Sequence, residues 1–116
     1  MRYGSATRRN FKVRWGINGK RVNDHHIIPN QWRNHVVVKK ANYDVHASYN
    51  LMLMPTRQGM NELSVNSDRL IHELGHSKYN KYVKFMLDVM SEDDIWIFRD
   101  FLKKNCRVNE DNIPWN

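Results

Sequence analysis

The sequence predicts an α+β fold in which two short strands precede a helix and a further helix follows near the C-terminus. Two short segments, 20–26 and 50–54, are each bounded by turn residues or a proline and predict the strands. Apolar residues recur at about 3.6-residue spacing from 67 to 90 and predict the first helix. Ser91, with the acidic Asp94 three positions later, forms a capping box that predicts the start of the last helix.

The length of 116 residues suits a single domain, 1–116. The predicted strands and first helix define a core over 20–90, and the capping box defines a C-terminal helix over 91–104. Residues 1–19 are expected to form a basic N-terminal arm, whose polar first ten residues either contact phosphates or fray.

Two further segments complete the predicted core. Residues 30–40 predict a short helix with Asn30 as its N-cap, although three consecutive valines disfavour it. Residues 56–67 are rich in Gly, Asn and Ser, and predict a connecting loop.

The charge of the chain indicates a polyanionic partner. Nineteen Lys and Arg residues face 12 Asp and Glu residues, which gives a net charge of +7 and a pI of about 9.8. A basic surface attracts nucleic acid foremost, and an anionic membrane as the second candidate.

Several classes of protein are excluded by what the sequence lacks. The single cysteine, Cys106, permits no internal disulfide and no cysteine-based zinc site. No apolar run approaches the roughly 20 residues that span a bilayer, and the first twelve residues lack the hydrophobic segment of a secretory signal. We therefore expect an intracellular protein.

Four of the six histidines form two pairs whose spacing suits metal binding. His72 and His76 lie four apart in the predicted helix, so their side chains are about 40° apart around the axis and can converge on one ion. His25 and His26 end the first predicted strand, where one ring can meet a metal and the next a substrate. The other two histidines lack a partner at ligand spacing and are expected to be structural or exposed. They are His35 and His46.

One alternative assigns the helical pair to a zinc peptidase. His72, Glu73 and His76 match the H-E-x-x-H pattern, in which the glutamate is the general base. A third ligand is missing at the expected downstream positions, where the chain has Tyr79 and Tyr82. The short chain also leaves little room for a peptidase substrate-binding sheet.

Three segments in this order carry a more specific pattern: Asp24-His-His-Ile-Ile-Pro29, Tyr49-Asn-Leu-Met-Leu-Met-Pro55 and His72-Glu-Leu-Gly-His-Ser-Lys-Tyr-Asn80. The pattern resembles the AHH family of the HNH, or His-Me finger, nuclease superfamily. The chain departs from it where Asp24 replaces the usual Ala, and where Glu73-Leu74 replaces small residues. The resemblance implies a ββα-metal (His-Me finger) core with an additional C-terminal helix, and an HNH-type endonuclease that hydrolyses phosphodiester bonds.

The resemblance also implies a role for each site residue. His26 is the general base that takes a proton from water, and Asn50 orients His26 or fixes the nearby loop. His25, His72 and His76 hold one divalent metal ion. Imidazole ligands suit zinc or nickel, whereas HNH nucleases often use magnesium or manganese, so the ion stays open among Zn, Ni, Mn and Mg.

Asp24 leaves open an alternative assignment, or register, of the metal ligand and the general base. In that register Asp24 binds the metal and His25 is the base, as in nucleases with an Asp-His pair. The fixed His-Ile-x-Pro spacing favours His26 as the base. A second alternative is a non-catalytic nucleic-acid-binding module that keeps the metal for structure.

Substrate contacts are expected along the predicted helix that carries the histidines. Arg69 and Asn80 fall on the same stripe as His72 and His76, and Lys78 lies nearby. No base-reading element is evident, so we expect backbone contacts with little sequence preference. The resemblance favours DNA over RNA as substrate and includes toxins with an immunity or inhibitor protein. The apolar last helix predicts either a core element or a homodimer interface.

Overall fold

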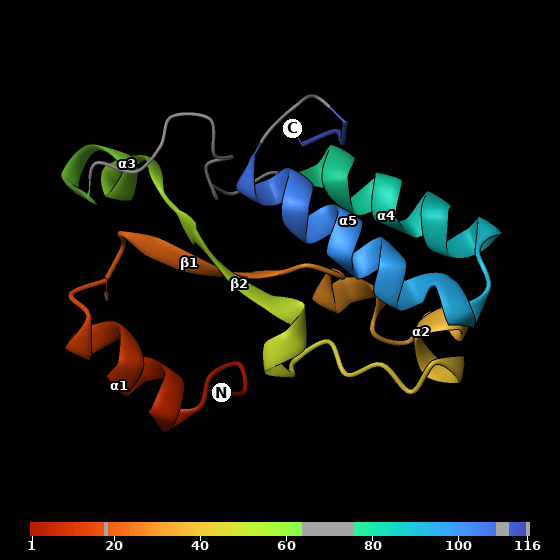
Figure 1. Ribbon diagram of the computed structural model, residues 1–116, viewed down its shortest axis with the longest axis horizontal. Helices are drawn as coiled ribbons and strands as arrows, with labels where there is room; N and C mark the ends of the chain where they lie inside the picture. The colour runs from red at the N-terminus through yellow and green to blue at the C-terminus, as the bar shows by residue number, and fades with distance from the viewer. Residues whose placement is uncertain (18, 64–75, 109–111, 116) are drawn as a thin grey trace.

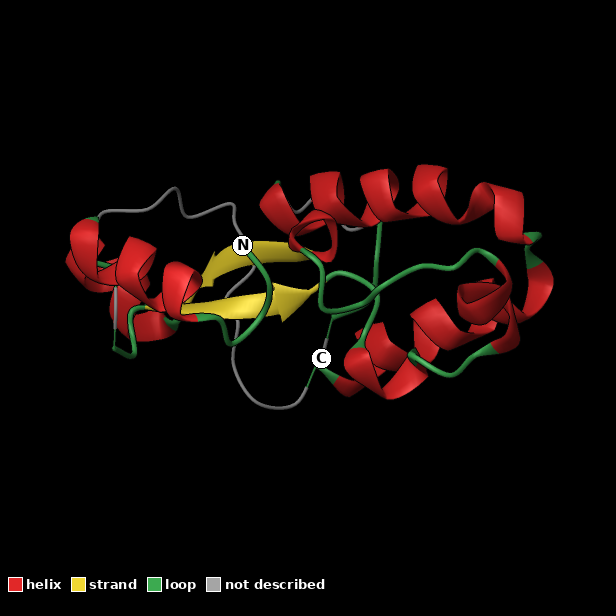
Figure 2. Ribbon diagram, turned by 90° about the horizontal axis from the view of Figure 1, so that it is seen from below, coloured by secondary structure: helices red, strands yellow, loops and turns green. Residues whose placement is uncertain are grey.

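The computed structural model of the chain describes residues 1–17, 19–63, 76–108 and 112–115. Two antiparallel strands cross the middle of the molecule, with helices at both ends of the strand pair (Figures 1 and 2). The helices and strands are α1 (Ala6–Arg14), β1 (Val22–His26), α2 (Val36–Lys40), β2 (Leu51–Pro55), α3 (Arg57–Leu63), α4 (Ser77–Val89) and α5 (Ile95–Arg107). Short 3-10 turns lie at Asn30–Trp32, Ser48–Asn50 and Glu92–Asp94. The fold is of the α+β class.

Strands β1 and β2 confirm the two predicted strands. They pair antiparallel, from Val22 opposite Pro55 to His26 opposite Leu51. Successive side chains of a strand alternate between its two faces, and the two histidines that end β1 differ in burial. His25 points into the core and is 1% exposed, whereas His26 is half-buried.

The core is closed by α4 and α5, which lie side by side (Figure 1). Buried side chains recur along both helices at three- or four-residue spacing, the pattern of a helix with one apolar face. The buried apolar residues are Tyr79, Val83 and Leu87 in α4, and Ile95, Phe98, Leu102 and Cys106 in α5. The Ser91 hydroxyl accepts a hydrogen bond from the Asp93 N–H at 3.3 Å and caps the 3-10 turn at Glu92–Asp94, whereas α5 begins only at Ile95, later than the predicted start at 91. Within the described ranges no helix combines the length and apolarity that crossing a membrane requires.

The N-terminal segment differs from the predicted arm because residues Ala6–Arg14 form α1. The Ser5 side chain accepts a hydrogen bond from the Arg8 N–H at 3.2 Å and caps the helix. Arg8 and Lys12 lie one turn apart and pair with Asp24 of β1 at 2.8 and 3.0 Å. These tertiary ion pairs hold the helix, whose own sequence has little apolar periodicity.

The helix predicted over 30–40 is interrupted. A 3-10 turn at Asn30–Trp32 precedes α2, and the chain between them is extended at His35. The His35 imidazole caps α2 by accepting a hydrogen bond from the Val37 N–H at 3.1 Å. The three valines nevertheless lie in α2. Burial of Val37 and Val38 in the core offsets their low helix propensity.

The loop predicted over 56–67 is wrong in its first half, where Arg57–Leu63 forms α3. The Thr56 hydroxyl accepts a hydrogen bond from the Gly59 N–H at 3.1 Å and caps this helix. Gly59 also lets α3 approach the chain before β1, since a Cβ added there would lie 1.8 Å from the Arg21 carbonyl oxygen.

Candidate active site

His25 lies at the centre of a buried cluster of rings. Its ring centroid is 5.0 Å from that of Tyr79, 5.5 Å from that of His76 and 5.4 Å from that of Trp115. Its Nε2 lies 3.7 Å from the Cys106 sulfur on α5. The side chain is therefore fixed by two helices and the C-terminal segment, which leaves it little rotational freedom.

His76 occupies the N-cap position of α4 rather than a helical position. Its ring stacks on Trp115 at 5.0 Å, and its Nδ1 lies 3.2 Å from the Asn80 side-chain oxygen. The prediction that a helix already runs through position 76 is therefore wrong: α4 begins at Ser77. The H-E-x-x-H peptidase alternative needs His76 inside that helix, so the structure does not support it.

Two of the predicted site residues, Arg69 and His72, lie outside the described residues, as does Glu73. Of the residues predicted to share one face of this helix, Asn80 lies in the described part of α4, in its first turn. Lys78 is exposed on the same turn of α4.

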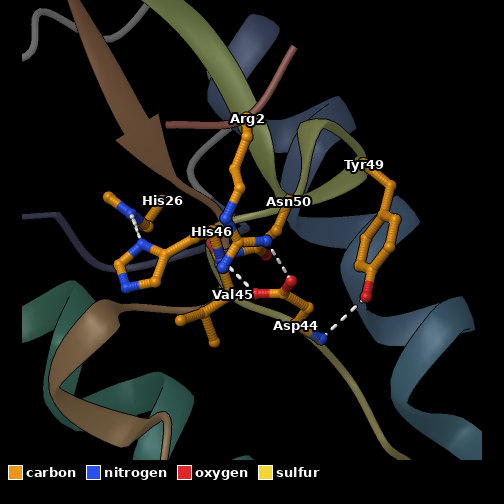
Figure 3. Close-up of polar contacts among 7 residues, drawn as sticks. All are labelled: Arg2, His26, Asp44, Val45, His46, Tyr49 and Asn50. Carbon is orange, nitrogen blue, oxygen red and sulfur yellow. Dashed lines mark hydrogen bonds and ion pairs between the residues drawn. The ribbon is translucent and has the colours of Figure 1, made fainter. Parts of the chain in front are cut away.

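The second histidine of β1 contacts a histidine that sequence spacing did not select. The His26 Nε2 lies 3.1 Å from the His46 Nδ1 (Figure 3). The Tyr3 ring lies against both imidazoles, with centroids 4.5 and 5.7 Å away. His46 was expected to be structural or exposed, and that expectation did not include this contact. Twenty residues separate the two histidines, and only the tertiary fold brings them together.

The surroundings of His26 favour its neutral form. Burial lowers the pKa of the His26 imidazole, and the nearby His46 and Arg8 lower it further, whereas Asp24 opposes them. A neutral imidazole carries the lone pair that a general base needs.

The Asn50 side chain connects the turn that follows β1 to the loop that precedes β2. Its side-chain oxygen accepts hydrogen bonds from the Ile28 N–H at 2.8 Å and the Tyr43 hydroxyl at 2.6 Å. Its amide nitrogen donates to the carbonyls of Ile28 at 3.0 Å and Val45 at 2.8 Å. Burial raises the pKa of Tyr43, so its hydroxyl stays protonated and donates. Asn50 thus ties the turn after His26 to the loop that carries His46 (Figure 3).

The Asp24 carboxylate is paired with two basic side chains of α1. Its two carboxylate oxygens face the Arg8 guanidinium and the Lys12 ammonium group. Burial raises the pKa of the Asp24 carboxyl, but the hydrogen bonds from both cations outweigh burial and hold it below its usual range. A carboxylate already paired with two cations is a poor ligand for a further cation, which weakens the register with Asp24 on the metal.

A cavity of about 260 Å³ opens beside these residues. His25, His26, His76 and Asn80 line it, together with Asp24 and the turn over residues 29–31. It brings the proposed base and two of the three predicted metal ligands to one place. Its size admits a phosphate group with water, because a water molecule occupies about 30 Å³ in the liquid.

Two of the three predicted metal ligands, His25 and His76, line this cavity. The rings of His25 and His76 lie at 85° to each other with centroids 5.5 Å apart, an arrangement in which both can approach a common ion. Across the part of the chain that the structure describes, no three His, Cys, Asp or Glu side chains gather closely enough to hold a metal. The third predicted ligand, His72, falls outside that part.

Comparison with protein families agrees with this site. The profile of the AHH family, described as a nuclease family of the HNH/ENDO VII superfamily with conserved AHH, matches residues 7–94. The chain therefore belongs to the AHH nuclease family, which confirms the resemblance, and its substrate is a nucleic acid. Nucleases of this superfamily generally use divalent metal ions. Comparisons with curated proteins and with solved structures gave no match.

Proposed function

We propose that this nuclease is a metal-dependent endonuclease that hydrolyses DNA phosphodiester bonds with little sequence preference. In this proposal β1, β2 and α4 form the ββα-metal core. His26 activates water, and His25, His72 and His76 hold one divalent cation. The observation that carries the proposal is the shared cavity of His25, His26 and His76 in a chain of the AHH family.

His26 performs the proton transfer. A water molecule in the cavity loses a proton to the neutral imidazole while its oxygen forms a bond to phosphorus. The bond between phosphorus and the 3′ oxygen breaks, and that oxygen takes a proton from solvent. When bound, the divalent ion supplies positive charge for the phosphate and the departing oxygen.

The other residues position the substrate. Asn50 keeps the chain after His26 in place, so the imidazole stays at the cavity wall. Asn80 lines the cavity, and Lys78 lies exposed on the same turn of α4, where both are suited to contact phosphate oxygens. The net charge of +7 favours association with the backbone of DNA or, as the alternative substrate, RNA.

Substitution of the base tests the proposal. We expect His26→Ala to reduce the rate of plasmid nicking by about 10²- to 10⁴-fold, the usual contribution of a general base, with DNA affinity retained. Nicking is measured on supercoiled plasmid and affinity by fluorescence anisotropy. A wild type that binds DNA tightly and cleaves neither DNA nor RNA would support the non-catalytic module instead.

A further inference from the structure

His46 contacts the proposed base without lining the cavity. It is not among the residues that line the cavity, and its Nδ1 lies 3.1 Å from the His26 Nε2 (Figure 3). Any effect of His46 on the reaction must therefore pass through the His26 ring.

The loop that carries His46 is fixed by several hydrogen bonds. The His46 N–H donates to the Asp44 carboxylate at 3.0 Å, and the Tyr49 hydroxyl accepts from the Asp44 N–H at 2.7 Å. On the other side the Tyr3 N–H donates to the His46 carbonyl at 3.0 Å. Arg2 pairs with the Asp44 carboxylate. These contacts hold the backbone of His46 in place, and the Tyr3 ring packs beside its imidazole.

The contact between the two rings selects one nitrogen of each. A neutral imidazole has one N–H and one lone pair, so one ring must donate and the other accept. If the His26 Nε2 carries the hydrogen, its Nδ1 keeps the lone pair and can accept a proton. If the His46 Nδ1 carries it, the His26 hydrogen lies on Nδ1 and that nitrogen cannot act as a base.

We propose that His46 is a positioning residue for His26: its Nδ1 accepts a hydrogen bond from the His26 Nε2–H and so presents the His26 Nδ1 to the water. This inference rests on the proposed role of His26 as base. When His26 takes the proton at Nδ1, its Nε2–H becomes the donor of a charge-assisted bond to His46, which is stronger than the neutral one.

Two substitutions of His46 separate hydrogen bonding from packing. His46→Asn keeps a side-chain oxygen near the place of Nδ1, whereas His46→Leu has a similar shape and no polar atom. For cleavage of a labelled DNA duplex, we expect His46→Leu to lower kcat by about 10- to 100-fold, the range known for losing the hydrogen-bond partner of a metal-binding imidazole, with KM unchanged. His46→Asn should recover most of kcat. The matched control is His35→Asn, at a histidine that caps α2, which should leave kcat unchanged.

A spectroscopic measurement tests the same inference without catalysis. Long-range ¹H–¹⁵N spectra of the histidine-labelled full chain should show the hydrogen of His26 on Nε2 in the wild type and in His46→Asn. In His46→Leu they should show a mixture of both forms. A wild-type His26 protonated on Nδ1, or wild-type kcat in a folded His46→Leu, would overturn the inference. Undiminished cleavage by His26→Ala would instead overturn the proposed function.

Discussion

His25 and His26 are neighbours in sequence but are held by different parts of the molecule. His25 is fixed in the core by Tyr79 and Cys106, and His26 is held from the opposite side by His46. Alternation along β1 produces this division, because it turns one ring toward the helices and the other toward the N-terminal segment. Two chemical roles at adjacent positions are therefore compatible with one strand end.

Asn50 gives the first prediction at the residue scale. Asn50→Ala removes four hydrogen bonds at a fully buried position and leaves the Ile28 and Val45 groups without their partner. We expect the free energy of unfolding to fall by about 3 kcal/mol, since an unsatisfied buried polar group costs about 1–3 kcal/mol and several are affected. Urea denaturation measures the change. The control Asn34→Ala, at an exposed position, should stay within about 0.5 kcal/mol of the wild type, and an equal effect of both would contradict the assignment.

At the scale of elements, α1 and β1 are joined by charge rather than by apolar packing. Arg8 is buried, and Lys12 approaches the same carboxylate one turn later. Because Asp24 directly precedes His25, the position of α1 bears on the strand end that carries both histidines. The N-terminal helix is thus part of the support of the site.

This ion pair predicts a pH-dependent stability. A carboxyl whose pKa is lower in the folded chain contributes stability that is complete above its ordinary pKa and is lost as the pH falls through the folded value. Asp24→Asn leaves the Arg8 charge buried and unpaired, so we expect a loss of about 3 kcal/mol at pH 7. The difference from the wild type should begin to shrink below about pH 4, the ordinary pKa of an aspartate, and should be lost once the pH falls through the lower pKa of the folded Asp24. Urea denaturation between pH 3 and pH 7 checks this.

An exposed acid supplies the control for that prediction. Asp88 pairs with His35 and Lys84 at the surface, and its pKa is also lowered by these hydrogen bonds. Asp88→Asn should change stability far less than Asp24→Asn, because exposed pairs contribute little. A pH-independent difference for Asp24→Asn would show that the ion pair does not stabilise the fold.

Local signals explain which elements were predictable from sequence. The strands ending at His26 and Pro55 depend on neighbouring residues and were confirmed, whereas Ser91 caps the 3-10 turn that precedes α5 rather than α5 itself. Helix α1 was missed because its stability comes from contacts with Asp24, and α3 because the Thr56 cap lies in a polar segment. The pair of His26 and His46 could not be predicted, since no spacing rule joins positions so far apart in the chain.

At the scale of the whole molecule, the positive charge extends over several elements. Basic residues lie on α1, in the last turn of α2, along α4 and in the last turn of α5. Only the basic residues near the cavity should contact the phosphates that flank the cleaved bond. The others should increase the rate of encounter with nucleic acid through the long-range field.

Lys78 tests this distinction. Lys78→Ala should weaken DNA binding equally for unrelated sequences, and the slope of log affinity against log salt should fall by about 0.9 if one phosphate contact is lost. Fluorescence anisotropy across a salt series measures both. Lys40→Ala, in the last turn of α2 at the other end of α4, is the matched control and should leave the slope nearly unchanged. Equal slopes for Lys78→Ala and the wild type would remove Lys78 from the interface.

Metal dependence is the most direct test of a catalytic centre at the end of β1. The measurement is the nicking of supercoiled plasmid by the full chain after chelation and after return of Zn²⁺, Ni²⁺, Mn²⁺ or Mg²⁺ in turn. We expect intact plasmid in the chelator and nicked plasmid once at least one of the four ions is restored. Continued nicking in excess chelator would contradict the account.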